Sequence, residues 1–313
     1  MQPLAMPPLL VPGSRVAVVA PSGPPLEDRL DRGLAWLRAS GLEPVESRGV
    51  RRRGGHGLDF FGGDDATRAA DLADAWCDPD IDGILCARGG DGAPRLIERL
   101  PWTRMREARP KVFAGLSDIT TLHQAVATRL ALATLWSPMP ATPVLAGAST
   151  QTPADASSRR GLLDALLTEP EVREVVLAGE TSRGSGPVTA PLVGGTVSLL
   201  AAMAGTPGAA PATGAIAVLE DVNEEPYRIE RFLTQLRRSG FFDGVVGVAG
   251  GDFVRCGTGD LVRRVLEDRL GDLGVPVVLG LPFGHGPQQA SLWLGRPATL
   301  DAASGTLRQA RPA

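Results

Sequence analysis

Short apolar runs alternate with helical patterns through the first half of the chain. The run RVAVVAPS (15–22) precedes LEDRLDRGLAWLRASG (26–41), whose leucines recur at helical spacing until Gly41 ends the pattern. The same order returns in IDGILCARGG (81–90), and again in KVFAG followed by DITTLHQAVATRLA. Strands joined through helices pair in parallel, and a parallel sheet is covered on both faces. We therefore predict an N-terminal α/β domain with a parallel sheet over residues 1–145.

The composition changes after this domain. Residues 146–185 open with AGASTQTPADASSRRG, a small, polar composition typical of a linker, and then form one short helix, LLDALLTEP. From residue 186 onward β-runs dominate, with helical patterns at 196–204 and 227–239. We predict a linker over 146–185 and a second, smaller α/β domain over 186–313.

Composition also excludes several classes of protein. The net charge of -3 argues against a nucleic-acid binder, which would present a basic face. The N-terminus lacks a basic n-region, and no long uncharged apolar stretch is present, so we expect a cytoplasmic protein with no membrane contact. The three cysteines, Cys77, Cys86 and Cys256, are widely spaced and show no zinc-binding pattern. We expect no metal and no cofactor.

One stretch, KVFAGLSDITTLHQAV (111–126), suggests chemistry. It predicts a strand, a tight turn and a helix, with Ser117 at the corner. A serine at this place is a favoured N-cap, because its oxygen accepts a backbone N–H from the first helical turn. It could equally be a nucleophile if the chain supplies a base, an orienting acid and an oxyanion site. The local pattern leaves both interpretations open.

Only three histidines could serve as the base. His123 lies on the same predicted helix as Ser117, about 9 Å of helical rise further along and on another face, so it cannot reach the hydroxyl. His56 lies in RRRGGHGLDFFGG, which is typical of a solvated loop. His285 follows an apolar strand and stands between two glycines, where a side chain is presented rather than buried.

Glu220 is the candidate orienting acid, since it ends the run AIAVLED. Side chains at the carboxyl ends of strands in an α/β sheet face the ligand crevice, whereas its neighbour Asp221 points to the other face. Glu220 could instead favour the N-terminus of the next helix. Backbone N–H groups of Asp118, Gly89 and Gly90 are candidates for the oxyanion site. The CARGGDG turn that holds both glycines lacks the spacing of a phosphate-binding loop.

Five segments, PSGP, ARGGDG, GLSDIT, LED…Y and GLPFGH, together resemble the LD-carboxypeptidase family, which shares its fold with the microcin-C immunity peptidases. The resemblance covers about residues 12 to 301. It implies a catalytic triad of Ser117, Glu220 and His285 in a cleft between the two domains. It also implies a serine carboxypeptidase that removes a C-terminal D-residue from murein tetrapeptide in cell-wall recycling. The family is often dimeric, so a homodimer is expected.

Several positions depart from the family's pattern. Asp91 replaces the usual Tyr of RGGYG, and Trp136-Ser137-Pro138 replaces HGP. We expect Asp91 and Trp136 to line the substrate cleft. A carboxypeptidase must also bind the terminal carboxylate, for which Arg88 and Arg228 are candidates because guanidinium binds carboxylate in a bidentate manner. For each arginine, a structural ion pair with a nearby acid is the alternative.

Two other functions stay open. A related hydrolase of peptidyl- or aminoacyl-nucleotides, of the microcin-C immunity type, would need aromatic residues in the cleft, and Trp136 and Trp293 are the candidates. A non-enzymatic protein that binds a ligand between two α/β lobes would need no nucleophile at all.

Overall fold

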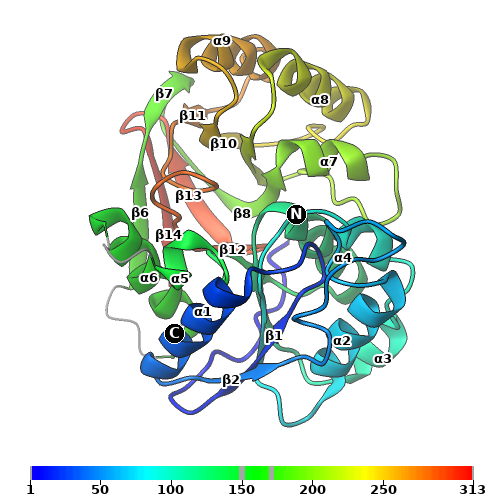
Figure 1. Ribbon diagram of the computed structural model, residues 1–313. Coiled ribbons are helices and arrows are strands. Elements are labelled where there is room, and N and C mark those ends of the chain that lie inside the picture. Colours follow the sequence, from blue (N-terminus) through cyan, green and yellow to red (C-terminus); the bar gives the residue numbers. More distant parts are fainter. Residues whose placement is uncertain (1, 148–151, 169–172, 312–313) are drawn as a thin grey trace.

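The computed structural model describes residues 2–147, 152–168 and 173–311, which form two packed α/β units (Figure 1). The first sheet has the strand order β12-β5-β4-β3-β1-β2, and β1 to β5 pair in parallel as predicted. Its strands are β1 Arg15–Val19, β2 Glu43–Glu46, β3 Gly83–Cys86, β4 Val112–Gly115, β5 Thr134–Trp136 and β12 Leu292–Leu294. Its helices are α1 Glu27–Ala39, α2 Asp65–Cys77, α3 Trp102–Glu107, α4 Thr120–Leu130, α5 Pro143–Ala146 and α6 Pro153–Leu166, with 3-10 turns η1 Ala93–Leu96 and η2 Ser117–Ile119.

The second sheet is mixed, with the order β6-β14-β13-β8-β9-β10-β11-β7. Its four central strands, β8 to β11, are parallel, and the outer strands are antiparallel. The strands are β6 Glu174–Ala178, β7 Glu180–Arg183, β8 Pro187–Thr196, β9 Ile216–Val222, β10 Gly247–Val254, β11 Val277–Leu279, β13 Pro297–Asp301 and β14 Thr306–Ala310. The helices α7 Val197–Met203, α8 Pro226–Arg238 and α9 Gly259–Leu270 pack beside it (Figure 1).

Most of the described residues within 146–185 lie in regular structure, so the prediction of a linker does not hold for them, while 148–151 and 169–172 lie outside the described residues. Helix α6 begins at a capping box formed by Thr152 and Asp155, and it buries Leu162 and Leu166 in the core of the first unit. Strands β6 and β7 are the two edges of the second sheet. Small polar residues give a linker-like composition but are tolerated on the exposed side of a helix, which explains the error.

The prediction that residues 186–313 form only the second domain also needs correction. Strand β12 leaves the second unit and pairs antiparallel with β5 at the edge of the first sheet. Trp293, at its centre, is buried and donates its indole N–H to the carbonyl of Ala165 in α6. The C-terminal part of the chain therefore closes the first sheet.

The two units share one apolar core cluster. Phe113 of β4 and Leu122 of α4 belong to the same cluster of buried side chains as Leu192 of β8 and Leu300 of β13. This continuous core fixes the carboxyl ends of the first sheet against the second unit. In the described residues, no helix combines the length and apolar character needed to cross a bilayer.

We expect Trp293→Ala to lower the free energy of unfolding by about 3–5 kcal/mol, because it removes a fully buried aromatic ring and its hydrogen bond to the Ala165 carbonyl. Urea unfolding followed by circular dichroism measures this change. Tyr227→Ala is the matched control: its side chain is 61% exposed, so its cost should stay within about 0.5 kcal/mol. Equal effects of the two substitutions would contradict the role of β12 in closing the sheet.

Candidate active site

Ser117 stands at the turn between β4 and α4 in a backbone conformation that serine seldom adopts, with φ 68°. A non-glycine residue in the left-handed region stores strain, and such residues concentrate at functional sites. Its hydroxyl caps no helix, since neither η2 nor α4 begins with a side-chain cap. The structure therefore does not support the interpretation of Ser117 as a helix N-cap.

The glycine turn after β3 touches this serine directly. A Cβ atom at Gly89 would lie 2.7 Å from Cβ and 3.0 Å from Oγ of Ser117, and 3.3 Å from the backbone nitrogen of Asp118. Only glycine permits this approach. Gly90 follows with φ 127°, again a glycine conformation. The structure thus brings Gly89 and Asp118 next to the hydroxyl, and Gly90 lines the same cavity.

The side chain of Asp118 holds these loops in place, a role that sequence reasoning missed. It is buried, and its Oδ2 accepts a hydrogen bond from Ser22 Oγ at 2.6 Å and from the Ala93 amide at 2.8 Å. Burial raises the pKa of this carboxyl to about 6, and the two hydrogen bonds oppose that shift. The PSGP and CARGGDG segments are therefore tied to the residue next to Ser117.

Glu220 and His285 form a buried pair. Glu220, at the end of β9, is fully buried, and its Oε2 accepts from His285 Nδ1 at 2.6 Å and from the His285 amide at 3.2 Å. Its Oε1 accepts from Thr196 Oγ1 at 2.6 Å. Since a carboxylate can only accept, Nδ1 carries the proton and Nε2 is left as the free, basic nitrogen.

A second acid, Asp252 of β10, lies beside this pair and was not predicted. A Cβ atom on Gly286 would come within 2.0 Å of its Oδ2, so the carboxylate packs on the backbone next to His285. Burial and the charge of Glu220 raise the pKa of Asp252 to about 6. Its only sequence signal is its place in the GGDF end of a β-run.

Ser117 and His285 line one cavity of about 440 Å³ between the two units, together with Arg88, Gly89 and Gly90. No hydrogen bond joins Ser117 Oγ to the imidazole among the residues that the structure describes. The described side chains that line the cavity include no Phe, Tyr or Trp. They do include the cations Arg29 and Arg255, which the sequence did not single out.

The substrate-binding candidates separate into one that reaches the cavity and three that do not. Arg88 is partly buried in its wall and has no ion pair among the described residues, so the structural alternative does not hold for it. Arg228, on helix α8, instead pairs with Glu224 at 2.6 Å and does not line the cavity. Asp91 is exposed and lies outside the cavity lining. Trp136 is buried in the shared core, so its expected place in the cleft is wrong.

The other histidines occupy different environments. His123 is buried, and its Nε2 lies 3.0 Å from the Gly115 carbonyl; burial lowers its pKa to about 4. His56 lies 3.3 Å from Asp65, away from the cavity. Within 2–147, 152–168 and 173–311, no group of three or more His, Cys, Asp or Glu side chains is arranged to hold a metal ion.

We predict pKa shifts of opposite direction for His285, which contacts Glu220, and for His123, which does not. Burial disfavours the imidazolium of His285, but the charge and hydrogen bond of Glu220 outweigh it and raise the pKa above the ordinary 6.5. In a ¹H–¹⁵N NMR titration, His285 should therefore remain protonated above pH 6.5, whereas His123 should titrate near pH 4.

In Glu220→Gln the charge is lost while burial remains, so the pKa of His285 should fall below 6.5. The pKa of His123, the internal control, should not move, because its only polar contact in the described part of the chain is the Gly115 carbonyl. An unchanged His285 titration in Glu220→Gln would contradict the assigned contact.

Comparisons with protein families, curated relatives and solved structures all find similarity to LD-carboxypeptidases. The LD-carboxypeptidase N-terminal domain matches residues 16–137, and the LD-carboxypeptidase C-terminal domain matches residues 189–300. A Streptomyces coelicolor protein provisionally named a carboxypeptidase is 49% identical over 314 residues, which cover 100% of this chain and 98% of the relative. The murein tetrapeptide carboxypeptidase of Pseudomonas aeruginosa is 34% identical over 304 residues, with 92% and 93% covered.

Among solved structures, the muramoyltetrapeptide carboxypeptidase of Oxalobacter formigenes is 27% identical with a TM-score of 0.81, covering 96% of this chain and 100% of that one. The protein MccF, solved in complex with glutamyl sulfamoyl guanosine, is 21% identical with a TM-score of 0.85, covering 99% and 98%, and so shares the fold. By both domain matches and full-length relatives, the chain belongs to the LD-carboxypeptidase family.

Proposed function

We propose that this protein is a serine carboxypeptidase that releases the C-terminal D-amino acid of murein tetrapeptide. The observation that carries the proposal is the bond from His285 Nδ1 to the buried Glu220, which leaves a basic Nε2 in the same cavity as the strained Ser117. A murein-directed activity is supported by relatives named for it. A cytoplasmic location and a homodimeric assembly stay predictions.

In the proposed mechanism, Nε2 of His285 takes the proton of Ser117 as Oγ attacks the carbonyl of the L-centre. The carbon–nitrogen bond then breaks, and the imidazolium returns the proton to the departing D-amino acid. Glu220 stabilises that imidazolium throughout. Water, deprotonated by the same nitrogen, attacks the acyl-serine ester and regenerates the hydroxyl.

The oxyanion is assigned to the amides of Asp118 and of Gly89 or Gly90. The Gly89 backbone packs against both Ser117 Oγ and the Asp118 nitrogen, which is where a tetrahedral oxygen would need donors. The bonds from Asp118 Oδ2 to Ser22 and Ala93 hold this arrangement before substrate arrives. Such preorganised donors are each worth about 100- to 1,000-fold in rate.

Hydrolysis of a peptidyl- or aminoacyl-nucleotide is the second candidate, because MccF shares the fold. A nucleobase is commonly bound by stacking on an aromatic ring. The two tryptophans considered for that role, Trp136 and Trp293, are both buried in the core, and the described lining of the cavity holds no Phe, Tyr or Trp. We therefore favour the murein peptide.

Ser117→Ala and His285→Ala should each lower turnover by about 10⁴-fold or more, and Glu220→Gln should cost less, since an orienting acid contributes less than the nucleophile. Mass spectrometry of L-Ala-γ-D-Glu-meso-diaminopimelate-D-Ala incubated with each protein measures the tripeptide formed. Circular dichroism verifies folding. Near-normal activity of His285→Ala would overturn the assignment, and cleavage of an aminoacyl-nucleotide but not of the tetrapeptide would favour the second candidate.

Arg88 is the proposed receptor of the substrate's terminal carboxylate. Burial, together with the nearby charges of Arg29 and Arg53, lowers its pKa, so a bound anion would relieve an uncompensated cation. Arg88→Lys should reduce kcat/KM about 10- to 100-fold for the free tetrapeptide, and much less for its C-terminal amide. Arg228→Lys, outside the cavity, is the matched control. Equal losses for acid and amide would show that Arg88 does not bind the carboxylate.

A further inference from the structure

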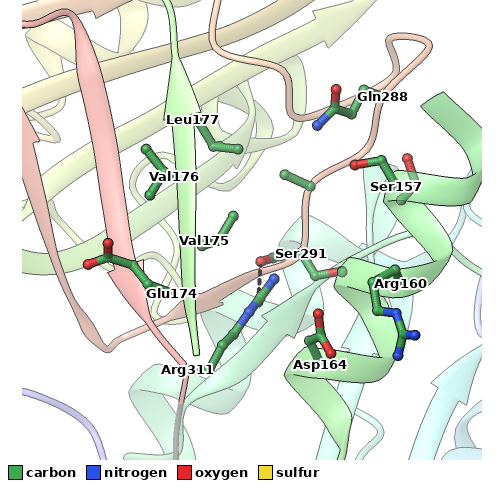
Figure 2. A pocket seen from close by; sticks show the side chains of 13 residues that line it. Ser157, Arg160, Asp164, Glu174, Val175, Val176, Leu177, Gln288, Ser291 and Arg311 are labelled. Carbon is green, nitrogen blue, oxygen red and sulfur yellow. Dashed lines mark hydrogen bonds between the residues drawn. The ribbon is translucent and has the colours of Figure 1, made fainter. Parts of the chain in front are cut away.

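A second cavity of about 380 Å³ lies between helix α6 and strand β6 (Figure 2). One wall comes from residues 157–164, the other from residues 174–177, and the floor from Ser291 and Arg311. None of these residues lines the cavity that holds Ser117. The proposed peptidase reaction leaves this second cavity without a role.

Arg311 presents an unused edge to this cavity. Its Nη1 donates to the carbonyl of Ser291 at 2.9 Å, whereas its buried Nε has no hydrogen-bond partner within residues 2–147, 152–168 and 173–311. Nη2 makes no hydrogen bond in the described part of the chain, and no described carboxylate lies within ion-pair distance. Burial lowers the pKa of Arg311 to about 10, which attraction from Asp164 only partly offsets. A buried donor on a cation is costly to leave unpaired.

Ser291 adds a second unsatisfied group at the same place. Its side chain is fully buried, and its Oγ has no hydrogen-bond partner among the described residues, although Ser291 lines the cavity. Figure 2 shows Ser291 and Arg311 together in the space between strand and helix. Two such orphan groups side by side are unusual, since buried polar atoms nearly always have partners. Both groups are therefore available to donate hydrogen bonds to a ligand bound in the cavity.

The lining narrows the ligand's chemistry. The Nε–Nη2 edge of a guanidinium binds a carboxylate through two parallel hydrogen bonds. Asp164 and Glu174 also line the cavity, Glu174 paired with Arg308 at 3.5 Å, and these carboxylates disfavour a multiply charged anion such as phosphate more than a single carboxylate. Val175 and Leu177 offer apolar surface for a short alkyl group. We propose that this cavity binds a small aliphatic monocarboxylate through Arg311 and Ser291.

The test is an NMR titration of the full chain with propionate, following the backbone amides of Ala290 and Ser291. Propionamide, which has the same shape without the charge, is the ligand control. Propionate should give saturable shifts at these amides in the millimolar range, as its few heavy atoms allow. Propionamide should give none. Equal binding of the two, or shifts confined to Arg88 and Ser117, would overturn the proposal.

Two variants separate binding from folding. Ser291→Ala removes a hydroxyl that bonds to no residue the structure describes, so the free energy of unfolding should be unchanged or higher, while propionate affinity falls about tenfold. Arg311→Lys keeps the charge but removes the bidentate edge, and affinity should fall by at least as much. Arg88→Lys is the matched control for the other cationic cavity and should leave the shifts intact. Unaltered affinity in Ser291→Ala and Arg311→Lys would refute the site.

Discussion

The site depends on the hydrogen bonds that the carboxylate of Glu220 accepts. It is fully buried, and an unpaired charge there would be strongly destabilising, so its three donors are structural requirements as well as catalytic aids. Those donors come from Thr196 at the end of β8 and from the backbone and ring of His285. Gly284 passes so close to this carboxylate that a Cβ atom would lie 2.6 Å from Oε2. The position of the loop that carries His285 is therefore restricted by Glu220.

Asp118 plays the corresponding part in the first unit. One carboxylate oxygen fixes the PSGP segment through Ser22 and the CARGGDG segment through Ala93, so three loops that are far apart in sequence meet at Ser117. Because the pKa of Asp118 is raised on folding, the folded protein binds a proton at this carboxyl more readily than the unfolded chain does. The group therefore favours folding more at pH 4 than at pH 7. The geometry around the serine is therefore held at a cost in stability at neutral pH.

The sequence predicted the parts of this arrangement that local patterns encode. Apolar runs that end in glycines or acids predicted the turn after β4 for Ser117, the last part of β9 for Glu220 and the loop after β11 for His285, because the period of apolar residues and the turn chemistry are local. Tertiary packing decided the rest. Trp136 ends strand β5, where a cleft residue could stand, yet its side chain packs in the shared core, and Arg228 pairs with Glu224, which precedes α8. Local patterns could not predict the bonds of the Asp118 side chain or the position of Asp252 beside His285, since their partners lie far along the chain.

The segment after Gly284 connects the two cavities. His285 and Gln289 face the cavity of Ser117, whereas Gln288 and Ser291 face the second one. The segment is restrained at both ends, by Glu220 at His285 and by the bond from Arg311 to the Ser291 carbonyl, and in between Gln289 donates its amide to Ser158 of α6. A ligand bound by Arg311 would therefore lie against the same short segment of backbone that carries His285.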